Sequence, residues 1–232
     1  MPLKGSYLTL NLKTVDLSQS ASTSDIICDA LRDAIIRGDI AEGQTLRQES
    51  IAQMFSVSRI PVREALKRLE SQGLVTSVRH KGVVVASMSP TEIAEIFEFR
   101  ALIEAKTIEL SVPAMSDADL DRAAGYCEKF SVETNPRKWG DLNRLFHMSL
   151  YESSERPYYL EIISSSNDRV ERYVRAQLEL TEGMSRARSE HQAILDACAK
   201  RDAKQAARLT GEHIERAGAA LIKFLQSHSE EF

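Results

Sequence analysis

The stretch at residues 58–75, SRIPVREALKRLESQGLV, predicts a helix whose two faces differ in character. Ser58 is a favourable N-cap, Pro61 falls in the first turn, where its missing N–H costs little, and Gly73 stands where helices commonly end. Apolar residues at three- and four-residue spacing define a stripe for burial, made of Val62, Ala65, Leu66 and Leu69. Another face carries basic residues four positions apart, namely Arg59, Arg63 and Lys67. One side of this helix should pack, and the other should present positive charge.

Two helical patterns precede this helix. Residues 23–37 carry apolar residues at helical spacing, beginning at Thr23, which is an N-cap candidate, and ending in a basic turn. Residues 48–55 show a shorter version of the same pattern. Because only Ser56 and Val57 separate that pattern from the basic helix, the two helices must cross sharply, as in a helix-turn-helix.

A hairpin pattern follows the basic helix. Residues 74–78 and 83–86 are rich in β-branched side chains, which favour strands, and the turn between them contains a glycine. This turn is formed by Arg79, His80, Lys81 and Gly82. The sequence therefore predicts a two-stranded wing with a basic tip beside the helix-turn-helix.

The composition is that of a soluble globular protein with one or two domains. The chain has 232 residues, of which 43% are hydrophobic and 28% are charged. No apolar run approaches the roughly 18 residues of a membrane span, and the N-terminus lacks a basic segment followed by an apolar one. We therefore expect a cytoplasmic protein without a membrane partner. Cys28, Cys127 and Cys198 are few and far apart, which favours reduced core thiols over disulfides or a four-cysteine zinc site.

The distribution of charge points to nucleic acid, although the net charge is -4. Residues 23–90 contain nine Lys and Arg against eight Asp and Glu, whereas residues 91–232 contain nineteen against twenty-five. Residues 59–81 contain six basic residues and only two acidic ones, Glu64 and Glu70. A local positive field governs docking on phosphate more than the isoelectric point does. This segment is therefore the candidate DNA-binding surface.

These patterns divide the chain into three parts. Residues 1–22 are rich in Ser and Thr and lack periodicity, which predicts a flexible arm, and residues 23–88 form the winged helix-turn-helix. Residues 89–232 begin with a capping pattern, Ser89 and Glu92, and then show only helical patterns. The helices predicted there span residues 90–112, 116–132, 136–153, 157–181, 184–200 and 203–227. The predicted fold is mainly α, with an N-terminal winged helix-turn-helix followed by an all-α antiparallel bundle of six or seven helices.

The N-terminal part resembles a known family. GQTLRQESIAQMFSVSRIPVREALKRLESQGLV, followed by a hairpin glycine, is similar to the winged helix-turn-helix of the GntR family of bacterial transcription regulators, with VSRIPVREAL as the most specific segment. The resemblance implies that Arg59 and Arg63 contact bases or phosphates and that Gly82 lets the wing approach the minor groove. In some members an arginine near the start of the second helix also contacts DNA. That position is Glu49 here, and Arg47, two residues earlier, is a candidate replacement. The predicted DNA-binding residues are Arg47, Ser58, Arg59, Arg63, Lys67, His80, Lys81 and Gly82.

Residues with metal-ligand chemistry recur in the helical part. Asn143 and His147 stand four positions apart and therefore share a helix face. His191 and His213 lie on consecutive helices at equal distance from the intervening turn, so in an antiparallel pair their imidazoles would lie at similar height. Three neutral imidazoles and an oxygen donor suit zinc, nickel or a similar divalent ion. A histidine in a helical domain is more often a hydrogen-bonded core or surface residue, so spacing alone leaves both interpretations open.

A second resemblance favours the metal interpretation. NRLFHMSL and SEHQAILDA are similar to the DxxFHxxL and EHxxIxxA patterns of the FCD ligand-sensing domain found in the FadR subfamily of GntR regulators. The resemblance implies a metal held in a central cavity by an Asp and three His, which here are Asn143, His147, His191 and His213. Asn143 replaces the Asp, and its neutral amide offers no charge to offset a dication. We therefore expect weaker metal binding or a greater dependence on an anionic ligand.

Arg100 is the candidate effector-binding residue. It lies near the apolar face of the first bundle helix and needs an anionic partner there. One possible partner is Glu104, four residues on. The other is the carboxylate of an effector, which the family resemblance implies, and the sequence leaves both open.

Three functions use these features to different extents. The leading one is a ligand-responsive, sequence-specific transcription regulator, expected to repress as a homodimer on a palindromic double-stranded DNA operator and to respond to a small carboxylate-containing effector. A constitutive dimeric DNA-binding protein would use every feature except the polar cavity. A His₃-metal hydrolase is the weakest alternative, because neither an HExxH motif nor a nucleophile partner accompanies the histidines. We therefore do not expect an enzyme.

Overall fold

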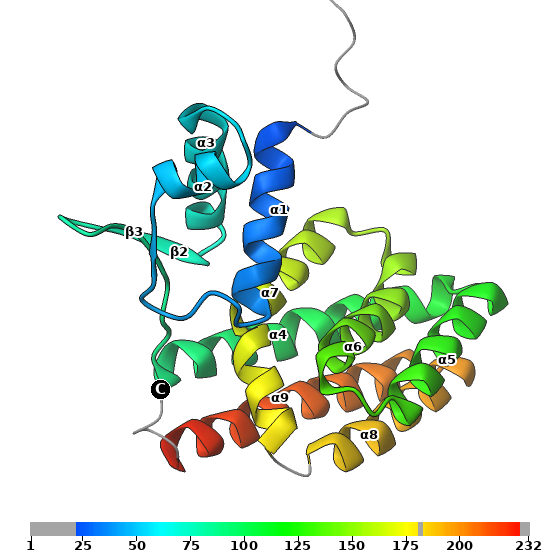
Figure 1. Cartoon of the computed structure of the whole chain (residues 1–232). Coiled ribbons are helices and arrows are strands. Elements are labelled where there is room, and N and C mark those ends of the chain that lie inside the picture. Colours follow the sequence, from blue (N-terminus) through cyan, green and yellow to red (C-terminus); the bar gives the residue numbers. More distant parts are fainter. Residues whose placement is uncertain (1–21, 181–182, 228–232) are drawn as a thin grey trace, which may run out of the picture.

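The computed structural model of the chain describes residues 22–180 and 183–227. The arm predicted at residues 1–22 lies outside the described residues except for Ser22, and so does the predicted helix end at residue 181. Figure 1 shows a small N-terminal unit, residues 22–88, placed against a larger bundle of long helices, residues 89–227. None of the described helices is long and apolar enough to cross a membrane.

The N-terminal unit has the element order of a winged helix-turn-helix, as predicted. Its elements are α1 (Thr23–Ile36), β1 (Thr45–Leu46), α2 (Gln48–Met54), α3 (Arg59–Ser71), β2 (Val75–Val78) and β3 (Gly82–Val85). The apolar stripe predicted on α3 is buried, and Val62, Ala65 and Leu69 are each 0% exposed. It packs in one core with the apolar face of α1 and with Val85 of β3.

The N-cap of α1 is Ser22, so the prediction of Thr23 was wrong by one residue. The Ser22 hydroxyl accepts a hydrogen bond from the backbone N–H of Asp25 at 3.2 Å, and the Asp25 carboxylate accepts one from the backbone N–H of Ser22 at 3.1 Å. This reciprocal capping box satisfies backbone N–H groups that a helix start leaves free. Thr23 cannot form it, because the residue three positions further on is the apolar Ile26.

The predicted two-stranded hairpin is present, but the sheet has a third strand, β1, that the sequence did not predict. β2 and β3 form the antiparallel hairpin, and β1 joins the other side of β3, with Thr45 opposite Val84 and Leu46 opposite Val83. A strand of two residues is too short to show the alternation by which strands are recognised in a sequence. Its backbone pairing and the burial of Leu46, which is 7% exposed, hold it in place.

The bundle contains the six α-helices that the periodicity predicts, together with two short 3₁₀ turns in the described residues. These elements are α4 (Pro90–Ser111), η1 (Val112–Ala114), α5 (Asp117–Val132), α6 (Pro136–Tyr151), η2 (Glu152–Ser154), α7 (Pro157–Leu180), α8 (Gly183–Ala199) and α9 (Ala203–Ser227). Figure 1 shows α4 and α9 running side by side, and they make the most extensive helix pair of the bundle. Their backbones approach closely at Gly218, where an added Cβ would lie 2.7 Å from Cβ of Phe97.

The N-terminal unit and the bundle meet along α7, at a contact that we call the junction. Arg172 donates a hydrogen bond to the carbonyl of Ala86 and forms an ion pair with Glu42 at 2.8 Å. The hydroxyl of the next residue, Tyr173, accepts a hydrogen bond from the backbone N–H of Met88 at 2.9 Å. At the junction, α7 therefore contacts both the turn before β1 and the segment that leaves β3.

Candidate DNA-binding surface and metal centre

Helix α3 and its N-cap carry half of the predicted DNA-binding residues, namely Ser58, Arg59, Arg63 and Lys67. Arg59, Arg63 and Lys67 are exposed, away from the buried stripe of the same helix. Ser58 takes the N-cap position with an extended backbone, but its side chain makes no capping hydrogen bond. The Ser58 hydroxyl and the N–H groups of the first turn can therefore bind an anion such as a phosphate. Arg47 takes the equivalent N-cap position of α2 and is also exposed.

Arg59 has a partner that the sequence did not indicate. Its guanidinium donates a hydrogen bond to Oε1 of Glu49 at 2.8 Å, and the two side chains are 65% and 64% exposed. Glu49 thus pairs with Arg59, and it occupies the position where the family resemblance predicts another arginine. An exposed ion pair of this kind contributes only about 0–1 kcal/mol. A phosphate can therefore compete with Glu49 for the guanidinium.

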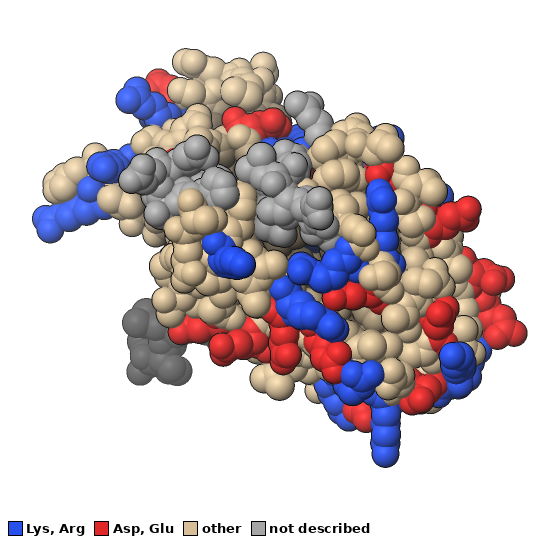
Figure 2. All heavy atoms as spheres, turned by 90° about the horizontal axis from the view of Figure 1, so that it is seen from below, with Lys and Arg blue, Asp and Glu red and all other residues tan. Residues whose placement is uncertain are grey.

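The tip of the wing is basic and exposed. His80 and Gly82 have positive φ angles of 67° and 81°, which shape the turn between β2 and β3. Glycine adopts such an angle readily because it has no Cβ. Figure 2 shows basic side chains at the projecting left-hand end of the molecule, where Figure 1 places the wing, whereas the bundle surface mixes acidic and basic side chains.

His147 of α6, His191 of α8 and His213 of α9 come together inside the bundle. Each offers one ring nitrogen, and these atoms all lie within 4.8 Å of one another. The three residues are 4%, 0% and 7% exposed. The ring centroids of His147 and His213 are 5.2 Å apart, and each lies 4.9 Å from that of His191. The structure therefore brings together three of the four residues that the sequence suggests as metal ligands.

Burial keeps the imidazoles of His147 and His191 neutral. It is the main cause that lowers the pKa of both His147 and His191 well below the usual value, and the pKa of each is lowered further by neighbouring imidazoles. A neutral imidazole keeps a lone pair that can bind a metal. Neither ring nitrogen of His191 has a hydrogen-bond partner among the described residues. Buried polar atoms seldom lack a partner, and a bound cation would supply one.

Neighbouring side chains select the tautomers of His147 and His213. The buried hydroxyl of Tyr151 donates a hydrogen bond to Oε2 of Glu104 at 2.8 Å and lies 3.3 Å from Nδ1 of His147. Because the only proton of that hydroxyl goes to Glu104, its oxygen accepts from Nδ1–H of His147, which leaves Nε2 with a free lone pair. Nδ1 of His213 lies 2.7 Å from Oε2 of Glu190, which selects the same tautomer there.

The sequence did not indicate these roles for Tyr151 and Glu104. Tyr151 stands four residues after His147, and Glu104 stands four after Arg100, so each pair could be assigned to one helix face. Spacing cannot show that α4 and α6 bring the two pairs into contact. The chain of contacts from Arg100 to His147 therefore becomes visible only when the helices are packed.

Arg100 is buried, and its partner in the structure is Glu104. Nε of Arg100 donates a hydrogen bond to Oε1 of Glu104 at 2.7 Å, and the two side chains are 9% and 0% exposed. The guanidinium also lies over the ring of Phe97, 5.0 Å from its centroid. Of the two partners that the sequence left open, Glu104 is thus present. Arg100 nevertheless lines the cavity beside the histidines.

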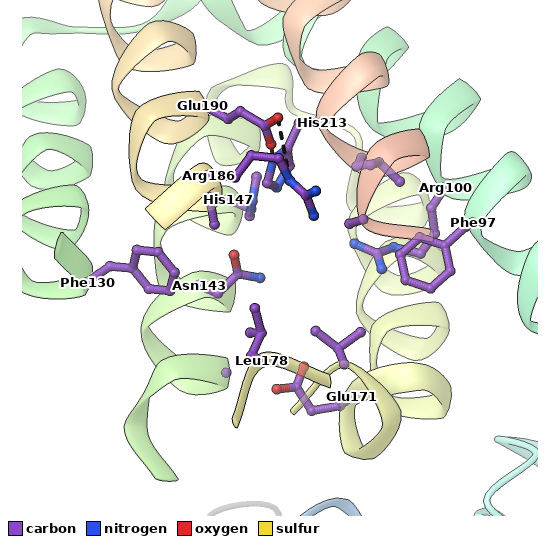
Figure 3. Close-up of a pocket in the computed structure, with 15 residues that line it drawn as sticks. Phe97, Arg100, Phe130, Asn143, His147, Glu171, Leu178, Arg186, Glu190 and His213 are labelled. Atoms are coloured by element: carbon purple, nitrogen blue, oxygen red, sulfur yellow. Dashed lines mark hydrogen bonds and ion pairs between the residues drawn. The ribbon is translucent and has the colours of Figure 1, made fainter. Parts of the chain in front are cut away.

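A cavity of about 60 Å³ lies beside the histidine cluster. Figure 3 shows His147 and His213 at one end of it, Arg100 at its side and Glu171 at the far end. The half-buried Asn143 points into the same space from α6. At about 10–15 Å³ for each ordered water, such a cavity accepts a few waters or a small ligand.

Two family models match the chain. The model described as "Bacterial regulatory proteins, gntR family" matches residues 23–85, which include the helix-turn-helix and the wing. The model described as "FCD domain" matches residues 95–216, which include the three histidines.

Individual proteins are similar over most of their length. The HTH-type transcriptional repressor GlaR of Escherichia coli (strain K12) is 29% identical over 195 residues, which cover 79% of this chain and 89% of that protein. The gluconate operon transcriptional repressor of Bacillus licheniformis is 29% identical over 194 residues, which cover 80% of this chain and 79% of that protein.

Solved structures show the same fold. A GntR family regulator from Pseudomonas syringae pv. tomato superimposes with a TM-score of 0.56 and 32% identity, covering 89% of this chain and 87% of that one. A putative GntR transcriptional regulator from Rhodococcus sp. RHA1 gives a TM-score of 0.75 and 25% identity, covering 88% of this chain and 99% of that one.

Proposed function

The chain belongs to the gntR family of bacterial regulatory proteins and carries an FCD domain, and on that premise we propose that this DNA-binding transcription regulator is a repressor that senses a small organic acid through a bound metal. In this proposal residues 23–88 bind the operator, and residues 89–232 hold the metal, bind the acid and form a homodimer. The observation that carries the sensing role is the cluster of three buried imidazoles, one of which has two ring nitrogens without partners among the described residues.

The DNA-binding role is assigned to the exposed basic face of α3 and to the wing. Arg59 and Arg63 would contact base edges or phosphates in the major groove, and Lys81 at the wing tip would approach the adjacent minor groove. The exposure of these side chains supports the assignment. The proposed set is Arg47, Ser58, Arg59, Arg63, Lys67, His80, Lys81 and Gly82.

The donors at the histidine cluster suit a divalent metal such as zinc or nickel. His147, His191 and His213 would each supply one imidazole nitrogen, and Asn143 would supply an amide oxygen. When bound, the metal would act as a Lewis acid that attracts a carboxylate. Because all four donors are neutral, they would leave the charge of the ion uncompensated, which favours an anionic ligand over water.

Arg100 would provide the second attraction for an acid. Glu104 takes one of its hydrogen-bond donors, and a guanidinium has five, so others remain for a ligand carboxylate. An acid bound between Arg100 and the metal would change DNA affinity only if it binds one arrangement of the N-terminal units better than another. The related repressor from Bacillus licheniformis is named for an operon of gluconate, which is itself an organic acid.

A second copy of the chain is the partner that we propose for the outer face of α4. Phe99 and Leu102 are 45% and 74% exposed there. Large apolar side chains three residues apart lie on the same side of a helix, and an exposed patch of this kind favours association. A two-fold dimer would place two α3 helices on the half-sites of a palindromic operator.

Neither alternative function accounts for the site as well. In a constitutive DNA-binding dimer, the buried nitrogens of His191, which lack a partner among the described residues, would destabilise the fold and serve no function. The hydrolase is not retained, because the similar proteins are transcription regulators and not enzymes.

Metal analysis of histidine variants tests the sensing site. Full-length protein would be loaded with zinc, passed over a desalting column and analysed by mass spectrometry of the metal content. We expect about one ion per chain in the wild type, and a loss of metal in His147→Ala and His191→Ala. His80→Ala, on the exposed wing, is the matched control and should keep its metal. Full metal content in His191→Ala would contradict the ligand assignment.

A ligand screen tests the response to acids. Small carboxylic acids should raise the melting temperature of the zinc-loaded protein, because a ligand that binds only the native state stabilises it. The same acids should have little effect after chelator treatment or in Arg100→Ala. A screen in which no acid changes either the melting temperature or operator binding would favour the constitutive dimer.

A further inference from the structure

Glu171 of α7 is a carboxyl group at the end of the cavity away from the histidines (Figure 3). The Glu171 side chain is half-buried, and burial is the main cause that raises the pKa of its carboxyl. Among the described residues, none donates a hydrogen bond to it. Its oxygens can therefore accept a hydrogen bond from a group in the cavity.

Gly140 of α6 makes room for the Glu171 carboxyl. A Cβ at Gly140 would lie 1.8 Å from Oε1 of Glu171 and 3.0 Å from its Cδ. Glycine in a helix interior costs about 0.5–1 kcal/mol relative to alanine. The helix therefore carries a destabilising residue at the point where the carboxyl lies against its backbone. Gly140 and Glu171 line both this end of the cavity and the adjacent hollow beside Arg144 and Asp168.

The charged groups that the structure describes near Glu171 do not provide a hydrogen-bond donor for its carboxyl. Arg144 and Arg100 favour its ionised form, whereas Asp141 and Asp168 disfavour it. Arg144 is itself paired with Asp168, and Arg100 also has a carboxylate partner. Neither arginine is therefore a dedicated partner of Glu171.

The cavity wall between the two ends is mainly apolar. Its side chains include Phe97, Val174, Leu178, Ile214 and Ala217. The cavity thus has imidazole nitrogens, Arg100 and Arg186 at or near one end, mainly hydrocarbon together with the amide of Asn143 in the middle, and a carboxyl at the other end. A ligand complementary to these three regions of the cavity has an anionic group at one end, a short carbon chain in the middle and a hydrogen-bond donor at the other end.

We infer that Glu171 is a second recognition point of the pocket, and that the effector is a small monocarboxylic acid with a hydroxyl or amino group at its other end. The acid carboxylate would meet Arg100 and the metal, and the hydroxyl or amino group would donate a hydrogen bond to Glu171. This inference rests on the proposed acid-sensing function and adds the class of acid. It also assigns a role to the glycine at position 140.

Calorimetry with matched acids tests the inference on full-length, zinc-loaded protein. The probes are propanoate, butanoate and pentanoate, their ω-hydroxy and ω-amino derivatives, and butanedioate as a dicarboxylate. At the chain length that spans the cavity, we expect the hydroxy or amino acid to bind about tenfold more tightly than its parent, which is the effect of one hydrogen bond to a charged group. A dicarboxylate that binds more tightly than every hydroxy and amino acid would overturn the inference.

Variants at Glu171 separate recognition from folding. In Glu171→Leu the preference for the substituted acid should disappear while the parent acid still binds. In Glu171→Gln, which keeps the shape and the carbonyl oxygen, preference for a hydroxy acid should persist and preference for an amino acid should fall. Glu161→Leu, at an exposed position of the same helix, is the control and should match the wild type.

The outcomes distinguish this inference from the proposed function. If the parent acids bind but no substituted acid is preferred, or if the preference survives in Glu171→Leu, acid sensing stands and the role of Glu171 is wrong. If no acid binds, parents included, acid sensing itself is contradicted and the inference falls with it.

Discussion

His147 and His213 each have one ring nitrogen, Nδ1, engaged by a neighbour, which leaves Nε2 available for a metal. The neighbours are the hydroxyl of Tyr151 and the carboxylate of Glu190. Partners of this kind fix the tautomer and the ring orientation of a ligand, and their loss commonly lowers metal affinity about 10–100-fold. His191 has no such partner among the described residues, so its orientation depends on packing against Phe130 and Phe146.

The substitution Tyr151→Phe should therefore lower zinc affinity about tenfold while leaving the three imidazoles in place. The ring still fills its buried site, so the far-ultraviolet circular dichroism should not change. Competition with a fluorescent chelator measures the affinity, and Tyr158→Phe, 69% exposed on α7, is the control. Equal zinc affinity in Tyr151→Phe and the wild type would show that the Tyr151 contact does not support the site.

The Glu49–Arg59 pair predicts a gain in DNA binding. Glu49→Gln removes a negative charge from the proposed DNA surface and frees Arg59, so operator affinity should rise severalfold at low salt and less at high salt. Arg59→Ala should instead lower it. Fluorescence anisotropy at two salt concentrations measures both effects, with Glu95→Gln on α4 as the control. Weaker binding by Glu49→Gln would mean that the carboxylate orients Arg59 for DNA.

Glu171 predicts a pH dependence of stability. Its folded-state pKa is raised above the ordinary value of 4.5, so the unfolded chain releases the proton first and stability falls as pH rises above that value. Glu171→Gln cannot ionise. Its melting temperature should exceed that of the wild type at pH 7, and the difference should shrink toward pH 5. Glu161→Gln is the control, and a difference that does not vary with pH would contradict this account.

Among the helices, α4 and α9 approach each other closely at a small residue, Gly218. Cβ and Cγ of Phe97 would each lie 2.7 Å from a Cβ added at Gly218, and neither atom is at the flexible end of its side chain. Gly218→Ala should therefore destabilise the protein by roughly 1–3 kcal/mol, although alanine is the better helix former.

A second glycine offers the opposite result as a control. Gly125 of α5 has no atom within 4 Å of an added Cβ, so Gly125→Ala should stabilise the protein by up to about 1 kcal/mol. Denaturant unfolding of both variants measures the two changes. If Gly218→Ala is as stable as Gly125→Ala, the backbones of α4 and α9 are not held at the described distance.

Most element positions were predictable from the sequence because their signals are local. Ser89 with Glu92 forms the predicted capping box at the start of α4, and helical periodicity located the helices that follow. β1 was missed because its two residues carry no pattern of their own and are defined only by pairing with β3.

The candidate site was predictable in part for the same reason. His147, His191 and His213 could be brought together by their distances from helix turns and by the family patterns. Tyr151 and Glu171 could not be assigned, because their contacts depend on which helices face each other and at what distance. The contact between α6 and α7 at Gly140 produces no periodic pattern in the sequence of either helix.

At the scale of the whole molecule, the proposed homodimer can be tested through α4. Leu102→Glu places a charge in the exposed apolar patch, so it should convert a dimer into monomers and weaken binding to a two-half-site operator. Light scattering coupled to size-exclusion chromatography gives the mass. Val132→Glu, at a 69% exposed position of α5, is the control. A dimer that survives Leu102→Glu would place the dimer contact elsewhere.

The junction has a mechanical consequence because it lies on the same helix as the cavity wall. Glu171 faces the cavity, and the next two residues, Arg172 and Tyr173, bind the segments on either side of the wing. Successive residues of a helix point in directions about 100° apart. If α7 rotates by about 10° about its own axis, a side-chain atom ~5–6 Å from that axis moves by roughly 1 Å. A rigid α7 cannot turn at Glu171 without turning at Arg172 and Tyr173. Any rotation of α7 about its axis would therefore change the cavity and the position of the N-terminal unit together.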